Sequence, residues 1–408
     1  MSSSKYNQNI KVAWLLPSMA RGYVWQPVFR EFTRLFPKST VFTGQKPVQF
    51  SQNDKLPFNL KIVGKFRFLK LAGQKSTYDR GIILPPMNIP FHLLKFRPKI
   101  IFAAGFSLWT MISIIMKPLM RWKIIIIYDG SSPEIDVKDS WIRTIARRLM
   151  TKVTDAFITN TKTGKSYLVE FLYAKNEQVF ARPYQVADKK FLTDINFNIK
   201  EVVGDIKHPV FLYIGLIIKR KGIDFLLKAC AELNKRGHKD YTLLIVGNGP
   251  EREELETFIK EKSIENQVKW VGWVEYNNLG QIFNFSDIFI LPTLEDIWGI
   301  VVTEAMIFGK PVLCSRLAGA WELVVDGENG YTFDPTLDKP EILADRMSEF
   351  VEKPELADSM GEKSKEYISY HTPEAVAQHL KKVVGYVSGE SDISKTTFPE
   401  HSKKYSNF

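Results

Sequence analysis

Short apolar runs alternate with helix-like segments along the second half of the chain. The apolar runs are Pro209–Gly215, Tyr241–Gly247, Val268–Val274, Ile288–Pro292 and Pro311–Ser315. The helix-like segments are Ile223–Leu233, Glu251–Lys262, Leu279–Phe285 and Ile300–Phe308. Strands and helices that alternate through short connections form βαβ units, so this pattern predicts a buried parallel sheet with helices on both faces.

The first half shows the same alternation less regularly, which predicts a second doubly wound α/β domain. Strands are predicted at Lys11–Pro17, Thr40–Thr43, Lys99–Ala103, Lys123–Tyr128 and Asp155–Thr159, and helices at Pro27–Phe36, Ser107–Met116 and Ser140–Lys152. We expect residues 1–195 to form the first domain and residues 196–388 the second, whose last helix can pack back on the first. The polar residues 192–208 are predicted to be a linker, and residues 389–408 a disordered tail.

Two predicted helices of the first half are each compatible with two different environments. Ser107–Met116 is apolar all round, which predicts a buried helix, with a membrane-facing or acceptor-lining helix as the alternative. Ser140–Lys152 is amphipathic, with Arg143, Arg147 and Lys152 on one side and Ile142, Ile145 and Leu149 on the other. We expect its basic side to face solvent, and the alternative is attachment to acidic lipid.

Charge is distributed unequally along the chain. The 408 residues carry a formal net charge of +11. Residues 1–195 contain 31 Lys and Arg against 12 Asp and Glu, a net charge of +19, whereas residues 196–408 contain 25 against 33, a net charge of −8. A basic half-chain favours an anionic partner, such as nucleic acid, an acidic membrane surface or a phosphorylated acceptor.

Three features indicate the cellular setting. Met1–Gln8 is polar, unlike a secretory signal peptide, and no run reaches the roughly 20 apolar residues of a membrane-spanning helix. Cys230 and Cys314 lie in apolar stretches and show neither disulfide nor metal-ligand spacing. We therefore expect a cytoplasmic protein with buried thiols, in peripheral contact with the inner face of the membrane.

Unusual residues follow four predicted strands of the second half. They are Gly215 to Gly222 after the first strand, Gly247-Asn248-Gly249-Pro250 after the second, Gly272-Trp273-Val274 after the third and Thr293 to Gly299 after the fourth. Ligands of open α/β sheets bind beyond the carboxyl ends of the strands. These segments are therefore predicted to converge on one ligand site.

The residue types in these segments suit a nucleotide diphosphate sugar. Glycines allow the backbone to approach a bulky ligand, and a helix that begins near Gly299 presents N–H groups and a positive dipole end to phosphate. Lys221 adds a full positive charge. Asp296, and Glu304 about one turn inside the helix, are suited to accept hydrogen bonds from sugar hydroxyls.

The segment from Asp296 to Val312 resembles the acid-x7-Glu signature of retaining glycosyltransferases of family four, also called group one. The blocks that match the rest of the family's pattern, in order, are Gly215…Lys221-Gly222, Val246–Pro250, Val271–Val274 and Glu322–Gly330. The resemblance covers residues 180–387 closely and the first half by layout. It implies the GT-B fold, in which two Rossmann-like doubly wound domains face an interdomain cleft.

Residue roles follow from this resemblance. Glu304 would hold the ribose hydroxyls, Asp296 the transferred sugar and Lys221 the diphosphate. The other donor-side contacts that it implies are Gly215, Arg220, Gly247, Asn248, Val274, Trp298, Gly299 and Ile300. No metal is expected, because the family transfers sugar with retention and without one.

This sequence departs from the family pattern in three places. The first acid is Asp296 instead of the commoner Glu, and Leu216 replaces an Arg, whose phosphate contact Arg220 could supply. The N-terminal Gly-Gly loop contains only Gly22, preceded by Arg21. We expect both of these residues on the acceptor side.

A polar residue for the acceptor side is also expected at a strand end of the first half. The family often has a histidine there, but Ile100–Phe106 has none. Asp129 is the nearest candidate for a catalytic or acceptor-side role, and an ordinary turn residue is an equally weighted alternative.

The function predicted from these features is transfer of a hexose-type sugar, from a UDP-sugar in preference to other donors. The predicted acceptor is a lipid-linked or cell-surface polysaccharide intermediate. The alternatives are a sugar-nucleotide 2-epimerase of the same fold and a basic nucleic-acid or anion-binding module. A nucleotide-dependent oxidoreductase is disfavoured, since no G-x-G-x-x-G follows Pro17 or Gly215.

Overall fold

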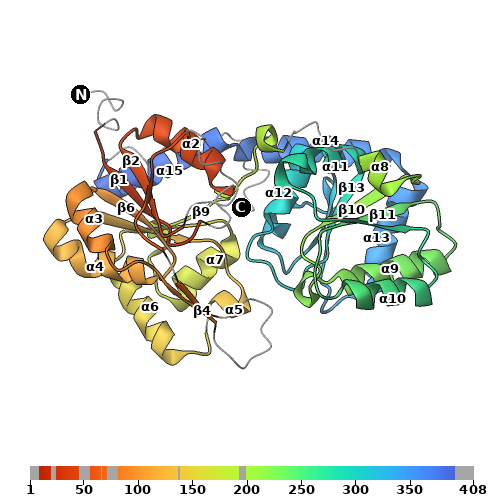
Figure 1. Cartoon of the computed structure of the whole chain (residues 1–408), viewed down its shortest axis with the longest axis horizontal. Coiled ribbons are helices and arrows are strands. Elements are labelled where there is room, and N and C mark those ends of the chain that lie inside the picture. Colours follow the sequence, from red (N-terminus) through yellow and green to blue (C-terminus); the bar gives the residue numbers. More distant parts are fainter. Residues whose placement is uncertain are drawn as a thin grey trace. The chain divides into compact units, whose positions relative to one another are not determined.

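The computed structural model describes residues 9–19, 24–45, 56–65, 67–70, 81–136, 138–192 and 199–390. The chain divides into two compact units (Figure 1). Unit 1 contains residues 1–186 and 373–408, and unit 2 contains residues 187–372.

Unit 1 is built on a parallel sheet with the strand order β3-β2-β1-β6-β7-β8-β9. Its strands are β1 (Val12–Leu15), β2 (Ser39–Thr43), β3 (Leu60–Ile62), β6 (Ile100–Ala104), β7 (Lys123–Tyr128), β8 (Ala156–Thr159) and β9 (Val179–Ala181). An antiparallel pair, β4 (Arg67–Lys70) and β5 (Gly81–Leu84), stands apart from this sheet. Its helices are α2 (Gln26–Leu35), α3 (Ile89–Phe96), α4 (Leu108–Met120), α5 (Pro133–Asp136), α6 (Trp141–Val153), α7 (Lys162–Ser166) and α15 (Pro373–Ser388).

The core of unit 1 is aromatic. The indole of Trp14 on β1 stacks on Phe102 of β6 and meets Phe29 and Phe32 of α2 edge-on. The last helix, α15, packs against α2. Strand-to-helix contacts of this kind fix the sheet, and with it the positions of the loops at its carboxyl edge.

Unit 2 contains a second parallel sheet, in the order β12-β11-β10-β13-β14-β15. Its strands are β10 (Val210–Ile214), β11 (Thr242–Val246), β12 (Val268–Gly272), β13 (Ile288–Leu291), β14 (Val312–Ser315) and β15 (Gly330–Phe333). Its helices are α8 (Ile199–Val203), α9 (Ile223–Lys235), α10 (Arg252–Glu261), α11 (Leu279–Phe285), α12 (Ile300–Ile307), α13 (Pro340–Glu352) and α14 (Glu355–Ile368). Buried aliphatic and aromatic side chains fill the space between the sheet and α9, α10 and α13.

The strand order of unit 2 reverses between β10 and β13. After β10, the next two strands along the chain, β11 and β12, lie on one side of it, and β14 and β15 lie on the far side of β13. Such a reversal separates the loops on either side and opens a crevice at the carboxyl ends of the two central strands. Unit 1 has its own reversal between β1 and β6.

The prediction of two doubly wound α/β sheets is confirmed. The bounds of β7 and of α11 are those read from the sequence. The predicted linker is not wholly irregular, because α8 lies inside it and buries Ile199 and Val203. The strands β3, β9 and β15 and the helices α3, α13 and α14 were not predicted.

One prediction about burial is wrong. The helix expected to be buried, α4, buries only Trp109, Thr110 and Ser113 and leaves Leu119 81% exposed. On α6 the predicted exposure of the basic side is confirmed for Arg143 and Lys152, whereas Arg147 is partly buried. The apolar side of α6 is exposed as well, with Ile145 49% exposed. Hydrophobic spacing could not distinguish these helices from core helices, because an apolar stripe has the same period whatever covers it. None of the described helices combines the length and apolarity needed to cross a membrane.

Candidate functional site

The loops after β10 and β13 meet through an ion pair. Nζ of Lys221 lies 2.5 Å from Oδ2 of Asp296, although 75 residues separate the two in sequence. Both side chains are partly buried. Burial alone would raise the pKa of Asp296, but the charge and hydrogen bond of Lys221 hold that pKa below its ordinary value. The crevice of unit 2 therefore carries a fixed carboxylate and a fixed ammonium group side by side.

A tight backbone approach makes this pairing possible. Gly222 has a φ of 65°, and a Cβ added there would lie 2.0 Å from the carbonyl oxygen of Pro292. Next to it, the N–H of Leu294 donates to the carbonyl of Arg220 at 2.7 Å, and the hydroxyl of Thr293 donates to the same oxygen at 2.9 Å. Only glycine fits at position 222, so the block around Lys221 is held against the end of β13.

Arg220 is buried behind this pair. Its Nη1 donates to the carbonyl oxygen of Glu295 at 2.6 Å. The guanidinium group therefore supports the loop that carries Asp296, and its charge helps to lower the pKa of that carboxyl. The structure thus shows Arg220 bonded to the backbone, and its predicted contact with phosphate stays a prediction.

Glu304 lies in the second turn of α12 and is 3% exposed. Its Oε1 has no hydrogen-bond partner among the described residues. Burial raises the pKa of Glu304 to about 7, although a hydrogen bond from Tyr276 works in the opposite direction. An unpaired buried carboxyl oxygen costs free energy, and such groups are typical of ligand sites.

The loops after β10 and β11 also touch one another. Gly247 has a φ of 133°, and an added Cβ would lie 1.9 Å from the carbonyl oxygen of Gly215. The N–H of Ile217 donates to the carbonyl of Asn248 at 3.0 Å. Beneath them, the hydroxyl of Tyr213 donates to the carbonyl of Leu216 at 2.9 Å. These contacts place two of the glycine-rich segments in one surface.

The start of α12 follows directly on the loop that carries Asp296. Gly299, with a φ of 88°, precedes the first turn at Ile300, and the N–H of Trp298 donates to Oδ1 of Asp296 at 3.4 Å. The N–H of Asp296 itself donates to Leu317 at 2.9 Å. Val274 is buried two residues beyond β12, the edge strand of this sheet. The first N–H groups of a helix lack intrahelical partners and attract anions.

In unit 1, Asp129 directly follows β7. Its Oδ1 accepts hydrogen bonds from the hydroxyl of Tyr184 at 2.7 Å and from Nε2 of Gln185 at 3.0 Å. Nδ2 of Asn160 donates to its backbone carbonyl at 2.8 Å. These hydrogen bonds fix both the side chain and the backbone carbonyl of Asp129. The two other acceptor-side candidates, Arg21 and Gly22, lie outside the described residues.

Sequence reasoning missed three residues that shape these sites. Tyr276 bonds Glu304, Thr293 bonds the loop beside Lys221, and Tyr184 bonds Asp129. Thr293 begins the segment that follows the fourth predicted strand, so a hydroxyl directly after a strand is the available signal. The two tyrosines act across long sequence separations, for which a single sequence carries no signal.

Across the described residues, no group of three or more His, Cys, Asp or Glu side chains could hold a metal ion. Cys230 and Cys314 are free and buried, and burial raises the pKa of Cys230 to about 12.

Comparison with known proteins finds a family match within unit 2. Residues 194–367 match the family described as glycosyl transferases group 1. Over 164 residues the chain is 30% identical to an alpha-D-kanosaminyltransferase of Streptomyces kanamyceticus, covering 40% of this chain and 42% of the relative. Over 151 residues it is 31% identical to a GDP-mannose-dependent alpha-(1-6)-phosphatidylinositol monomannoside mannosyltransferase of Mycolicibacterium smegmatis, covering 35% and 39%. The chain therefore spans less than half the length of each of these two curated relatives.

Solved structures resemble the chain over more of its length. The crystal structure of Alr3699/HepE from Anabaena in complex with UDP has a TM-score of 0.72, is 16% identical and covers 92% of this chain and 100% of that one. At this identity the likeness shows the fold alone. The fold is that of GT-B proteins, with two doubly wound sheets.

Proposed function

We propose that this protein transfers a sugar from a nucleotide diphosphate sugar to an acceptor, since residues 194–367 match the family described as glycosyl transferases group 1. The observation that carries the proposal is Glu304, a carboxylate buried in α12 with an oxygen that no described residue satisfies. A bound ligand with hydroxyl groups would satisfy it.

Donor binding would use the residues gathered at the β10–β13 crevice. Glu304 accepts hydrogen bonds from the ribose hydroxyls, and the first N–H groups of α12 meet the diphosphate. Lys221 turns from Asp296 toward the phosphate oxygens, and Asp296 then accepts hydrogen bonds from the transferred sugar. The Gly215–Gly247 contact supplies a surface without side chains, which leaves room for the donor.

We propose a UDP-sugar with a hexose-type sugar as the donor. The family's frequent use of UDP supports this choice, as do structural neighbours. Alr3699/HepE has been solved with UDP-glucose, at a TM-score of 0.68 and 16% identity to this chain. The nucleotide base would rest against the backbone near Val274, at the edge of the sheet.

Transfer would proceed with retention at the anomeric carbon and without a metal ion. The acceptor hydroxyl attacks from the face that the diphosphate leaves, and the departing phosphate oxygen takes the hydroxyl proton. Lys221 and the helix N-terminus stabilise the charge that develops on this oxygen. Asp296 positions the sugar through its hydroxyls.

The acceptor would be a lipid-linked or cell-surface polysaccharide intermediate held by unit 1. The net charge of +19 on residues 1–195 suits a phosphorylated or lipid-linked molecule. Asp129, fixed by Tyr184 and Gln185, would accept a hydrogen bond from the acceptor. The mannosyltransferase of Mycolicibacterium smegmatis is named for a lipid acceptor, phosphatidylinositol monomannoside.

Calorimetric titration with UDP-, GDP- and ADP-sugars tests the proposal. We expect one nucleotide class to bind, Glu304→Ala to abolish that binding, and Lys221→Ala to weaken it strongly. Lys219→Ala is the matched control, since it removes an exposed lysine from the same turn and should bind as the wild type does. Failure of all three donors to bind, or wild-type affinity in the Glu304 variant, contradicts the proposal. Epimerisation of the donor sugar without transfer would favour a 2-epimerase.

A further inference from the structure

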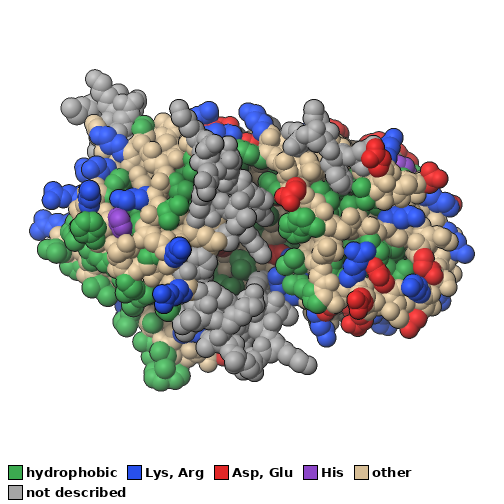
Figure 2. Space-filling view, in the orientation of Figure 1, with side chains coloured by type: hydrophobic (Ala, Val, Ile, Leu, Met, Phe, Trp, Pro, Cys, Tyr) green, Lys and Arg blue, Asp and Glu red, His purple; other side chains and the backbone are tan. Residues whose placement is uncertain are grey.

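Three neighbouring helices of unit 1 expose large apolar side chains. α3 contacts α4, and α4 contacts α6. The exposed residues are Phe91 and Leu94 of α3, Met111, Ile115 and Leu119 of α4, and Trp141, Ile142, Ile145, Leu149 and Val153 of α6. We name this set the apolar face. It includes half of the exposed large apolar residues in the described part of the chain, and hydrophobic side chains gather over α4 and α6 in Figure 2.

These side chains are not needed for the core of unit 1. α4 already directs Trp109 and Ser113 inward, where the indole of Trp109 donates to the carbonyl of Pro86 at 2.9 Å. The apolar face is on the outside of the same helices. Contiguous exposed apolar surface is rare on monomeric proteins and marks a site of interaction.

The charge of the three helices has one sign. α3, α4 and α6 contain no Asp or Glu, and their basic residues are Lys95, Lys117, Arg143, Arg147, Arg148 and Lys152. Arg147 and Arg148 are held inward by the carbonyls of Asp136 and Phe171. Arg143 and Lys152 are exposed and have no acidic partner among the described residues. The apolar face is therefore interleaved with free positive charge.

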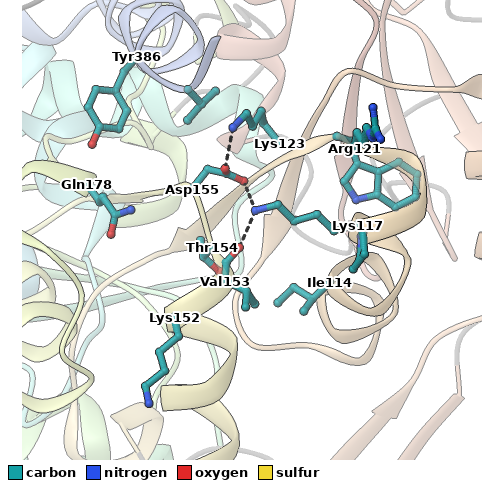
Figure 3. A pocket seen from close by; sticks show the side chains of 13 residues that line it. Ile114, Lys117, Arg121, Lys123, Lys152, Val153, Thr154, Asp155, Gln178 and Tyr386 are labelled. Carbon is teal, nitrogen blue, oxygen red and sulfur yellow. Dashed lines mark hydrogen bonds and ion pairs between the residues drawn. The ribbon is translucent and has the colours of Figure 1, made fainter. Parts of the chain in front are cut away.

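A basic pocket of about 780 Å³ adjoins the carboxyl-terminal ends of α4 and α6 (Figure 3). Lys117 and Lys123 line it, and their Nζ atoms lie 2.6 and 3.2 Å from the carboxylate of Asp155. These two lysines neutralise the one acid in the pocket. Arg121 and Lys152, which also line it, are exposed and lack an acidic partner within the described residues. An anionic headgroup is the chemistry that this pocket would accept.

We propose that the apolar face docks unit 1 on a bilayer that contains anionic lipids. Apolar side chains enter the headgroup–acyl boundary while the interleaved cations contact lipid phosphates. Trp141, 72% exposed at the start of α6, has the amphipathic ring that favours this boundary. A second copy of the chain fits less well, because two such faces would bring cations together without a carboxylate between them. The proposal does not depend on the donor site.

Sedimentation of the full chain with lipid vesicles tests this docking. We expect binding to vesicles of mixed phosphatidylcholine and phosphatidylglycerol, and little binding to phosphatidylcholine alone or at high salt. Leu119→Glu combined with Ile145→Glu should weaken binding by about 30-fold, since two inserted apolar side chains are lost. Arg143→Glu combined with Lys152→Glu should weaken it by about 30-fold, since each cation near the surface contributes about 1 kcal/mol.

The control variant replaces two apolar residues of unit 2 that are about as exposed as Leu119 and Ile145. Leu337 and Ile342 are 82% and 43% exposed, which matches 81% for Leu119 and 49% for Ile145. Leu337→Glu combined with Ile342→Glu should bind vesicles as the wild type does. Wild-type binding by the unit 1 variants, or equal binding to neutral vesicles, overturns the proposal. So does a concentration-dependent dimer that Leu119→Glu with Ile145→Glu abolishes, because a second copy then covers the face.

Discussion

Replacing Glu304 by glutamine should stabilise the free protein at alkaline pH and leave it nearly unchanged at acid pH. Glutamine has the shape of the protonated acid and can still accept the hydrogen bond from Tyr276. Unlike the acid, it never has to carry a charge in the buried site. The substitution thus separates the cost of burying a carboxylate from the cost of changing the side chain.

The size of the effect follows from the pKa. Burial raises the pKa of Glu304 from 4.5 to about 7. Between these values the folded protein binds more protons than the unfolded chain, so the free energy of unfolding falls as pH rises through about 7. At about 1.4 kcal/mol per pKa unit, the full penalty is about 3 kcal/mol; it grows as the pH rises from 4.5 to about 7 and is complete above the folded pKa.

Scanning calorimetry of both proteins on either side of this pH range measures the effect. We expect the glutamine variant to melt about 6–12 °C above the wild type at alkaline pH, from about 2–4 °C per kcal/mol for a unit of this size. Below the ordinary carboxyl pKa the two Tm values should agree within a few degrees. An equal Tm difference at both pH values would refute the reasoning, because Glu304 would then titrate like an exposed acid.

Four further outcomes are expected. Donor affinity should fall as pH drops below about 7, because protonated Glu304 accepts fewer hydrogen bonds; titration calorimetry across pH measures this, and a flat profile contradicts it. Lys221→Met should weaken donor binding by about 10–100-fold, as expected for a lost charged hydrogen bond, while equal affinity would remove Lys221 from the site. Gly247→Ala should lower the free energy of unfolding by about 2–4 kcal/mol in urea titrations, since its Cβ would lie 1.9 Å from a carbonyl oxygen. Chelation with EDTA should leave the transfer rate unchanged, and loss that added Mg²⁺ or Mn²⁺ restores would contradict metal-free transfer.

The alternation of strands and helices was readable because both sheets are parallel and buried. Strands of such sheets are short apolar runs, and β7, with four consecutive isoleucines from 124 to 127, shows this most clearly. Short or partly exposed strands such as β3 and β15 lack that contrast with their neighbours. The sequence shows that α4 is apolar and that α6 is amphipathic, but it does not show what covers their apolar side chains.

Part of the candidate site was predictable for a topological reason. Loops after neighbouring parallel strands must share one edge of the sheet, so Lys221 and Asp296 were expected near one another, and the structure brings them into an ion pair. The bond from Tyr276 to Glu304 and those from Tyr184 and Gln185 to Asp129 depend on loop conformations. One sequence contains no information about such loop contacts.

A crystal structure with the bound donor nucleotide tests the central claim most directly. We expect the ribose hydroxyls within hydrogen-bond distance of the Glu304 carboxylate, the diphosphate at the first turn of α12, and Lys221 contacting a phosphate oxygen. A nucleotide bound away from the β10–β13 crevice, or a Glu304 carboxylate left without any ligand contact, would contradict the claim.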